Sequence, residues 1–356
     1  MTATSKAEDP TEALQVGHFQ TLTFPSPDTA IITDAIHGTH TITEPVLLAL
    51  LRAQSLRRLV GVCQHGVTGL LGLTPTITRF EHSVGAFLLV RRAGGGVEEQ
   101  VAGLLHDASH TVLSHVMDWA LSKPGESFHE VHKDRYLAGT ELPGILSQHG
   151  FADHRPFQEE LYPLVERDAP HLCADRLDYA LRDAVAFGKL PLEDARGVVS
   201  CLTAHPDAAA DSPERILALR DPALGLRLAQ SYIACDRDVW ANPAHVDMAR
   251  RTGDLIGAMV RSGQISEDEL WCAGGDAEFW QTLKAKTDEA GREVIRRLEE
   301  DALPDEKGLG LPRAAKTRTI DPDIVVGEAL APLSEVDGTW KEELEAYRRS
   351  RQALRV

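Results

Sequence analysis

Residues 97–115, VEEQVAGLLHDASHTVLSH, decide the fold of this chain. The first part of the stretch carries apolar residues at helical spacing: Val97, Val101, Leu104 and Leu105. Residues three and four apart lie on one face of an α-helix, so the spacing predicts a helix with a buried face. That face leads directly to His106 and Asp107, an imidazole beside a carboxylate. Divalent transition metals accept this mixture of ligands, so the sequence predicts a metal site at the end of the helix.

The composition is that of an ordinary globular protein with an acidic balance. The 356 residues include 37 Lys and Arg against 54 Asp and Glu, which gives a formal net charge of −17. Nucleic-acid backbones are bound by basic surfaces, so we expect no constitutive nucleic-acid partner. The five cysteines form no CxxC pair, and we find neither a secretory signal pattern nor a membrane-spanning apolar run. We therefore expect a cytoplasmic protein without a membrane partner.

The pattern along the chain predicts a mainly α protein with a small β element at each end. Between Thr21 and Thr43, β-rich stretches broken by proline and glycine predict a hairpin, and a helical pattern begins at Pro45. Further helices are expected at about 155–190, 213–220, 224–241, 245–262 and 276–300. Near the end, RTIDPDIVV (318–326) predicts a strand and TWKEELEAYRRSRQ (339–352) an amphipathic helix. We divide the chain into an N-terminal segment, a core, a helical part that completes the core, and a C-terminal extension: 1–28, 29–200, 201–300 and 301–356.

Histidines are concentrated in one part of the chain. Six of the fifteen fall within 51 residues: His82, His106, His110, His115, His129 and His132. Two ligands seldom hold a metal ion, and His82 and Asp175 lie in helical patterns that can bring them to His106 and Asp107. These two imidazoles and two carboxylates leave coordination positions open for water or a phosphate oxygen, as a catalytic site requires.

The segment ADRLDYALRD (174–183) carries two candidate carboxylates with different surroundings. In a helix, Asp175 and Tyr179 share one face, whereas Asp178 and Arg182 form an i, i+4 pair nearer the other flank. We interpret Asp178 as a partner in a helix salt bridge and Asp175 as the metal ligand. Two nearby histidines are interpreted as structural and surface residues, respectively: His65 and His132.

Six blocks of sequence occur in the order seen in a known family: IITDAIHG, LRRLVGVCQHG, TRFEHSVG, HDASHTVLSH, FHEVH and ADRLDYALRD. Over residues 29–190 the chain resembles the HD-domain metal-dependent phosphohydrolases, in particular the branch of the deoxynucleoside triphosphate triphosphohydrolases. The resemblance implies that 29–200 is an HD-domain catalytic core, a helical bundle with the site in its interior. It also implies the metal ligands that ligand chemistry already suggests: His82, His106, Asp107 and Asp175.

The resemblance implies roles for the residues around the metal. Phosphate contacts are implied for four of them, of which His110 is also counted as catalytic: Arg79, His110, His115 and Arg176. Sugar contacts are implied for Gln64, Tyr179 and Asp183. The imidazole of His129 is expected to act on the scissile phosphoester, and the Glu130 carboxylate to orient it. The implied cofactor is a divalent ion, Mn, Fe, Co, Ni, Zn or Mg, and the implied assembly is a homo-oligomer.

The sequence departs from the family pattern at several positions. Ser109 replaces a glycine after the His-Asp doublet, and we expect it to narrow the approach to the ligands. The family's triphosphate hydrolases carry an arginine, an aromatic residue and a His-Lys pair on a helix that lines the site. The comparable stretch here, AQSYIACDRDVWANPAHVD (229–247), offers Tyr232 and Trp240 but has Asn242-Pro243 in place of His-Lys. Fewer cations are then available for a polyphosphate, and two acidic residues would repel one if they faced the site: Asp236 and Asp238.

Three functions agree with these residues. The first is hydrolysis of deoxynucleoside triphosphates at the α-phosphorus, which releases nucleoside and tripolyphosphate. The second is hydrolysis of a mononucleotide, a cyclic nucleotide or another phosphoester at the same metal. The third is a nucleotide-binding regulator without turnover, which the presence of both His129 and Glu130 disfavours because a pure binder does not need them.

Overall fold

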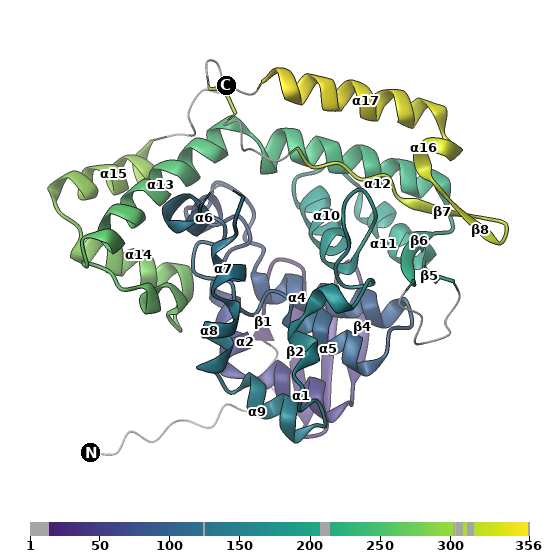
Figure 1. The fold of residues 1–356 in the computed structure, drawn as a ribbon, viewed down its shortest axis with the longest axis horizontal. Coiled ribbons are helices and arrows are strands. Elements are labelled where there is room, and N and C mark those ends of the chain that lie inside the picture. Colours follow the sequence, from purple (N-terminus) through teal and green to yellow (C-terminus); the bar gives the residue numbers. More distant parts are fainter. Residues whose placement is uncertain are drawn as a thin grey trace.

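The computed structural model describes residues 14–123, 125–206, 214–301, 303, 309–311 and 317–354. These residues are mainly helical and include two small sheets, so the predicted fold class is confirmed (Figure 1). The predicted N-terminal segment lies partly outside the described residues, as does much of the chain between residues 302 and 316.

The N-terminal β element is larger than the predicted hairpin. It is a sheet of four antiparallel strands in the order of the sequence: β1 (Leu14–Gln15), β2 (Gln20–Ser26), β3 (Thr29–Asp34) and β4 (Gly38–Ile42). The register between β2 and β3 shifts between Thr23 and Ser26. Pro25 lies in this irregular stretch, where its missing N–H removes a donor from the ladder.

Most of the remaining chain forms helices that begin where the sequence changes from β to helical patterning. The helices up to residue 201 are α1 (Pro45–Arg52), α2 (Gln54–Arg57), α3 (Val67–Leu70), α4 (Arg79–Arg92), α5 (Val97–Leu105), α6 (Val116–Leu121), α7 (Phe128–Val131), α8 (Lys133–Ala138), α9 (Leu142–Gln148), α10 (Ala174–Ala186) and α11 (Leu192–Cys201). Short 3₁₀ helices lie between them: η1 (Arg58–Gly61), η2 (Arg155–Phe157) and η3 (Glu159–Leu161). The later helices are α12 (Pro222–Cys235), the π-helix η4 (Asp236–Trp240), α13 (Pro243–Arg261), the 3₁₀ helix η5 (Glu267–Trp271), α14 (Gly275–Lys286), α15 (Glu289–Glu300), α16 (Leu333–Val336) and α17 (Gly338–Ala353).

The second sheet joins the middle of the chain to its C-terminal part. Its strands lie in the order β5 (Leu202–His205), β6 (Ile216–Leu219), β7 (Asp323–Val326) and β8 (Ala329–Pro332). Strands β6 and β7 are parallel, and the other pairs are antiparallel. The strand predicted at 318–326 is therefore present in its second half, and the helix predicted at 339–352 is α17.

Two helix predictions are wrong. The segment predicted as a helix at 213–220 contains strand β6, whose four residues are all buried. A short, wholly apolar run has no periodicity that separates a buried strand from a helix, so its pairing with β5 and β7 decides its structure. The predicted helix at 155–190 starts as η2 and η3, and α10 begins only at Ala174.

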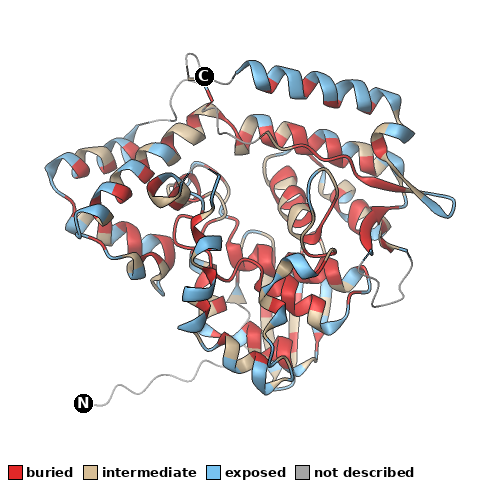
Figure 2. Cartoon of the chain, in the orientation of Figure 1, coloured by how far each residue is buried: buried red, intermediate tan, exposed pale blue. Residues whose placement is uncertain are grey.

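Helix α4 is buried on nearly all sides and lies between α5 and α10 (Figure 2). Its N-terminus is capped by the Thr78 hydroxyl, which accepts the backbone N–H of Glu81. A Cβ atom at Gly85 would collide with the Asp178 carboxylate and the Arg182 guanidinium. The missing side chain therefore allows α4 and α10 to approach closely, which brings their polar residues together in the interior.

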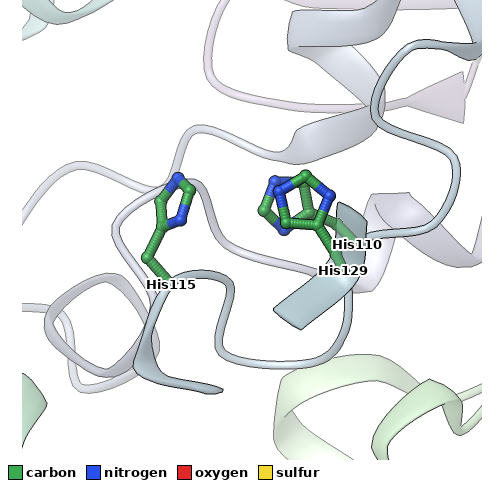
Figure 3. Close-up of side chains that lie close together, drawn as sticks. All are labelled: His110, His115 and His129. Atoms are coloured by element: carbon green, nitrogen blue, oxygen red, sulfur yellow. The ribbon is translucent and has the colours of Figure 1, made fainter. Parts of the chain in front are cut away.

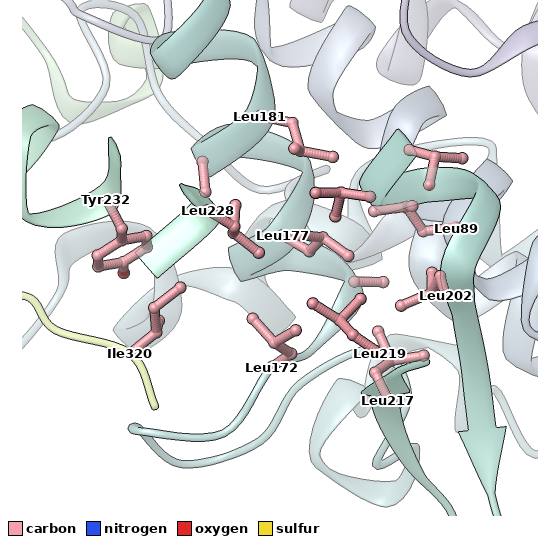
Figure 4. Close-up of a cluster of buried hydrophobic side chains, with 14 of the residues drawn as sticks. Leu89, Leu172, Leu177, Leu181, Leu202, Leu217, Leu219, Leu228, Tyr232 and Ile320 are labelled. Atoms are coloured by element: carbon pink, nitrogen blue, oxygen red, sulfur yellow. The ribbon is translucent and has the colours of Figure 1, made fainter. Parts of the chain in front are cut away.

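A large cluster of apolar side chains packs against α10. Leu177 and Leu181 of α10 pack with leucines of β6 and with Leu228 and Tyr232 of α12, and Ile320 from the C-terminal part joins them (Figure 4). Burial of such side chains contributes about 1.5–3 kcal/mol each.

Within the described residues, no helix is both long and apolar enough to cross a membrane.

Candidate metal centre and active site

Three predicted metal ligands meet at one point in the interior. His82 belongs to α4, His106 follows directly on α5, and Asp175 is the second residue of α10. His82 Nε2 lies 2.9 Å from Asp175 Oδ1 and 3.1 Å from His106 Nε2, and His106 Nε2 lies 3.4 Å from the same carboxylate oxygen. The donor atoms of these three residues lie within 4.8 Å of one another, as ligands of a single ion do.

The fourth predicted ligand, Asp107, borders this cluster. One of its oxygens lies 3.7 Å from His82 Nε2, and the other lies 3.8 Å from His106 Nε2. Arg79 Nη1 donates a 2.7 Å hydrogen bond to Asp107 Oδ2. Burial by itself raises the pKa of Asp107, but the Arg79 guanidinium and the two imidazoles outweigh it and hold that pKa below its usual range. Asp107 is therefore an ionised carboxylate within reach of a metal ion at the cluster.

The Nδ1 atoms of His82 and His106 form hydrogen bonds that suit metal binding through Nε2. His106 Nδ1 donates to the carbonyl oxygen of Gly103 at 2.8 Å, so this nitrogen carries the proton. His82 Nδ1 lies 2.9 Å from Asp178 Oδ2, and the carboxylate accepts its proton. Burial disfavours a charged ring, but the neighbouring carboxylates raise the pKa of both histidines. A bound ion displaces the protons on Nε2, and both Nε2 lone pairs then face the shared point. Two imidazole nitrogens and one or two carboxylates suit a divalent transition metal, so the residues present fit the ion that the sequence predicts.

Asp178 belongs to a buried charged network behind the donors. Its oxygens accept hydrogen bonds from Arg182 Nε at 2.8 Å and pair with His37 Nε2 at 2.8 Å, besides the contact to His82. Arg182 continues the network to Asp34, also at 2.8 Å. Asp178 forms the salt bridge predicted from the sequence, and it also contacts His82, which the i, i+4 spacing does not reveal. His37 and Asp34 belong to the same network, and although both stand in the IITDAIHG block, neither was predicted to do so.

A second group of histidines, His110, His115 and His129, lies close together (Figure 3), and His110 Nε2 is 3.3 Å from Asp107 Oδ1. The rings of His110 and His129 stack with centroids 3.6 Å apart, and the His115 ring meets that of His110 edge-on at 5.1 Å. Burial lowers the pKa of His129 to about 3 and holds the pKa of His110 well below its ordinary value. The stacked imidazoles are therefore neutral at pH 7. The donor nitrogens of these three histidines also lie within 4.8 Å of one another, so their positions are compatible with an ion as well, although the group includes no carboxylate.

Glu130 and Ser109 both approach the Nδ1 atom of His129. Glu130 Oε1 lies 3.4 Å from this nitrogen, and the Ser109 hydroxyl lies 3.5 Å from it. Partial removal from water raises the pKa of Glu130 to about 7. The serine that departs from the family pattern thus lies against the predicted catalytic histidine, on the same side as the predicted orienting carboxylate.

The two arginines that are predicted to contact phosphate already donate hydrogen bonds to groups of the protein. Arg79 donates to Asp107 and, from Nε, to the Ser114 hydroxyl at 2.9 Å, which leaves its buried Nη2 atom without a partner. Arg176 Nη1 donates to the carbonyl oxygens of Arg167 and His171 at 2.8 and 2.9 Å. These hydrogen bonds hold both guanidinium groups in place, and a phosphate contact from either stays a prediction.

The predicted sugar contacts form a polar and aromatic group beside the donors. The Tyr179 ring centroid lies 6.2 Å from that of His82, and its hydroxyl lies 2.6 Å from the Tyr232 hydroxyl. Asp183 accepts Trp240 Nε1–H at 2.5 Å and lies 3.0 Å from His65 Nε2. Gln64 Oε1 is buried without a hydrogen-bond partner. Trp240 belongs to the π-helix η4, a distortion that is frequent at functional sites and that re-aims side chains.

Comparison with known proteins shows the family to which the chain belongs. The chain is 53% identical over 338 residues to "Metal-dependent phosphohydrolase cns2" of Cordyceps militaris, which covers 94% of this chain and 97% of the relative. The chain belongs to the metal-dependent phosphohydrolases. It is also 31% identical over 300 residues to the uncharacterised protein YdhJ of Bacillus subtilis, with 83% of this chain and 89% of that protein covered. A more distant similarity, 25% over 191 residues, links 45% of the chain to 37% of a "Deoxynucleoside triphosphate triphosphohydrolase SAMHD1 homolog" of Dictyostelium discoideum. No protein-family model matches the chain.

As a metal-dependent phosphohydrolase, the chain is an enzyme that hydrolyses phosphoester bonds with the help of a divalent ion. Membership in this family and the resemblance stated above therefore agree on the class of reaction. A non-catalytic regulator, the third function considered from sequence, does not fit this membership.

The phosphohydrolase uses the residues that replace the family's basic helix for its own structure. The Asn242 side chain caps α13 by accepting the backbone N–H of Ala244 at 2.9 Å. Asp236 is buried and accepts the Tyr347 hydroxyl at 2.7 Å, while Asp238 pairs with Lys189 at 2.5 Å. The two acidic side chains are thus bound to protein groups, so the expected repulsion of a polyphosphate is reduced by these partners.

Proposed function

We propose that the chain hydrolyses nucleotides at the bond between the sugar oxygen and the first phosphorus, with deoxynucleoside triphosphates as the first candidate substrates. One observation carries this proposal. Asp175, Tyr179 and Asp183 lie at i, i+4 and i+8 on α10, which places them about 6 Å and 12 Å apart along the helix axis. A substrate with its phosphate at Asp175 therefore has its sugar beside Tyr179 and Asp183.

The residues around that substrate have distinct tasks in the proposed reaction. A bound divalent ion supplies a hydroxide at neutral pH and neutralises phosphoryl charge. The neutral His129 imidazole faces the leaving oxygen, and the negative charge of the phosphate raises its low pKa towards the range of a proton donor. Glu130, beside Nδ1 of His129, stabilises the protonated ring. The unpaired Nη2 atom of Arg79 offers a hydrogen bond to a phosphate oxygen.

A second candidate substrate is a phosphoester with a single phosphate, such as a mononucleotide. It is favoured by the hydrogen bonds that already occupy the guanidinium groups of Arg79 and Arg176. It is also favoured by Asn242 and Pro243, which begin a helix where the triphosphate hydrolases carry a His-Lys pair. A triphosphate needs several positive partners, whereas one phosphate needs few beyond the ion.

The products decide between the two candidates. Metal-depleted protein is supplied with Mn, Fe, Co, Ni, Zn or Mg and incubated with a panel of deoxynucleoside and nucleoside mono-, di- and triphosphates and cyclic nucleotides, and the products are resolved by ion exchange. Nucleoside with intact tripolyphosphate is the expected result. Orthophosphate from mononucleotides alone points to the second candidate, and hydrolysis of non-nucleotide phosphoesters alone overturns the proposal. The Asp107→Ala variant and the metal-free protein serve as controls, and both are expected to be inactive.

A further inference from the structure

Three successive backbone carbonyls after the His-Asp doublet accept hydrogen bonds from side chains of distant segments. Arg58 Nη2, from η1, donates to the carbonyl oxygens of Ala108 at 3.1 Å and His110 at 2.7 Å. Trp271 Nε1, from η5, donates to the carbonyl oxygen of Ser109 between them at 2.7 Å. The three acceptor residues are buried and belong to no helix or strand. Because a buried carbonyl without a partner is costly, these two side chains stabilise the turn in this conformation.

The ring of Trp271 packs on the segment that carries His129. It stacks on Phe128, the residue before His129 in α7, with ring centroids 5.8 Å apart and planes at 29°. It also stacks with Tyr136 of α8 at 5.5 Å, and the Tyr136 hydroxyl accepts Arg58 Nε–H at 3.1 Å. Trp271 therefore contacts the turn after the doublet through its N–H and contacts α7 through its ring.

The two segments that Trp271 contacts meet at the His129 ring. The Ser109 hydroxyl lies 3.5 Å from His129 Nδ1, and the His110 ring stacks on the His129 ring at 3.6 Å (Figure 3). Ser109 and His110 lie in a turn, and α7 has only four residues. A helix of this length is not stable by itself, so contacts with other segments determine how these rings lie.

We propose that Trp271 is a positioning residue for phosphoester hydrolysis, which holds Ser109 and His110 against the His129 ring and so keeps this ring at the leaving oxygen. The inference rests on the proposed role of His129 and adds a residue outside the blocks that the sequence analysis singled out. A displacement of about 1 Å in a reacting group can lower a rate about 10²-fold. Trp271 acts only through the residues that it holds, since its ring and N–H are bound to protein groups.

The test compares Trp271→Phe with the matched control Trp280→Phe in the metal-loaded enzyme. Phenylalanine keeps a ring for stacking but cannot donate to the Ser109 carbonyl oxygen. Trp280 of α14 also donates its N–H, to Glu299 of α15 at 2.8 Å, so its replacement removes the same kind of bond elsewhere. For Trp271→Phe we expect kcat for a nucleotide to fall about 10- to 100-fold, with KM and metal content changed little. Unchanged kcat, loss of metal, or an equal fall in Trp280→Phe overturns the inference.

A second substrate distinguishes positioning of a proton donor from a general structural role. The leaving oxygen of p-nitrophenyl phosphate is weakly basic and needs little help from a proton donor, whereas a sugar oxygen needs it. The fall in kcat for Trp271→Phe should therefore be much smaller with p-nitrophenyl phosphate than with the nucleotide. An equal fall with both esters overturns the inference.

A double variant tests whether Trp271 acts through His129. Where His129→Ala has already removed the ring, Trp271→Phe should lower kcat for the nucleotide little further, because residues that act as a unit are not additive. A further fall as large as in the unchanged enzyme overturns the inference.

Chemical labelling separates this inference from the proposed function, because it needs no turnover. Diethyl pyrocarbonate modifies accessible imidazoles, and peptide mass spectrometry compares the rates at the buried His110 and His129 with the rate at the exposed His115. Faster labelling of the two buried rings in Trp271→Phe supports the inference even if no nucleotide is hydrolysed, in which case the proposed function alone has failed. Unchanged labelling overturns the inference even if nucleotides are hydrolysed. Equal acceleration at His82, with a lower melting temperature, shows a general loosening of the fold and also overturns it.

Discussion

The metal donors and the histidine group beside them are built in different ways. His82, His106 and Asp175 stand on or directly after helices, and the second nitrogens of the two histidines are bound to Asp178 and to a carbonyl of α5. His110 and His115, in contrast, flank a turn in which Leu113 and Ser114 adopt left-handed φ angles of 56° and 50°. Such angles are strained for residues other than glycine, so the turn depends on the surrounding structure.

The two regions also differ in charge. The donors lie among ionised carboxylates and arginines, whereas the stacked His110 and His129 are kept neutral by burial. One interior thus holds a charged donor site and, beside it, imidazoles that burial keeps uncharged. Damage to the first region should remove the metal, and damage to the second should remove turnover while the metal stays.

The substitution His129→Ala should distinguish the two regions most clearly, because it should lower kcat without changing the metal content. If this imidazole protonates the leaving oxygen, kcat should fall about 10²- to 10⁴-fold. The metal content should not change if the ion is held by His82, His106 and Asp175, because His129 belongs to the other group of possible donors, with His110 and His115. The measurement combines steady-state kinetics with elemental analysis of the purified protein. His132→Ala is the matched control, since His132 contacts the rings of Phe128 and Trp271 and not the donors. Loss of metal in His129→Ala would show that the two regions are not separable.

The next largest effect is expected on the free energy of unfolding, and it comes from Asp276, a buried carboxylate of α14. Asp276 accepts the backbone N–H groups of Leu113 at 2.7 Å and Cys63 at 2.8 Å, and so holds the strained turn. Burial raises its pKa to about 6 from an ordinary value of 3.8. The folded state then keeps the proton more tightly than the unfolded state, so this group should reduce the free energy of unfolding as pH rises from about 4 to about 6. A shift of two units corresponds to about 3 kcal/mol.

Chemical denaturation across that pH range measures the effect. The unchanged protein should lose stability between pH 4 and pH 6 relative to Asp276→Asn, in which this titration is absent. A difference between the two proteins that is the same at both pH values would contradict the assignment of the slope to Asp276.

The comparison also shows which parts the sequence could predict. Helix α5 follows from local spacing, and the metal donors follow from residue types and ordered blocks around His106. Strand β6 could not be predicted, because four buried apolar residues fit a strand or a helix until a partner strand is known. The first part of the predicted long helix failed for a related reason, since residues 162–173 are arranged by contacts with distant segments such as Asp321.

Contacts between distant segments also limit the prediction of the site. His37 lies 141 residues from Asp178 in the sequence, so no local spacing connects them. Arg79 and Arg176 have the residue type for phosphate contact, but the structure shows carboxylate and carbonyl partners that a sequence does not reveal.

The substitution Asp178→Asn tests the metal-donor region, because the Asp178 carboxylate holds the His82 ring in place. The amide keeps the shape of the carboxylate but not its charge, so the Nδ1 proton of His82 loses a strong acceptor. Removal of such a supporting contact typically lowers metal affinity about 10- to 100-fold. The affinity is measured by competition with a chelator, and activity should return at high metal concentration. Unchanged metal affinity would show that α4 alone positions His82.

Asn is preferred to Ala at this position because Arg182 and His37 also depend on Asp178. Removing the whole side chain would leave the buried Arg182 Nε and the His37 ring without this hydrogen-bond acceptor, which costs about 1–3 kcal/mol for each group and confuses loss of metal with loss of fold. Glu345→Gln, an exposed change on α17, is the matched control for removal of one negative charge.

The smallest effect, and the finest test of the neutral region, is expected from Glu130→Gln. With a pKa of about 7, Glu130 is protonated in mildly acidic solution and ionised above neutrality. Only the ionised form stabilises a positive charge on His129, so the rate of the unchanged enzyme should rise with pH through about 7. The amide variant should lack this rise and be less than about tenfold slower at pH 8, because the ring itself is still present. The measurement is kcat against pH at saturating metal. A rise near pH 7 that persists in Glu130→Gln would assign that titration to another group and would leave Ser109 as the neighbour that orients the His129 ring.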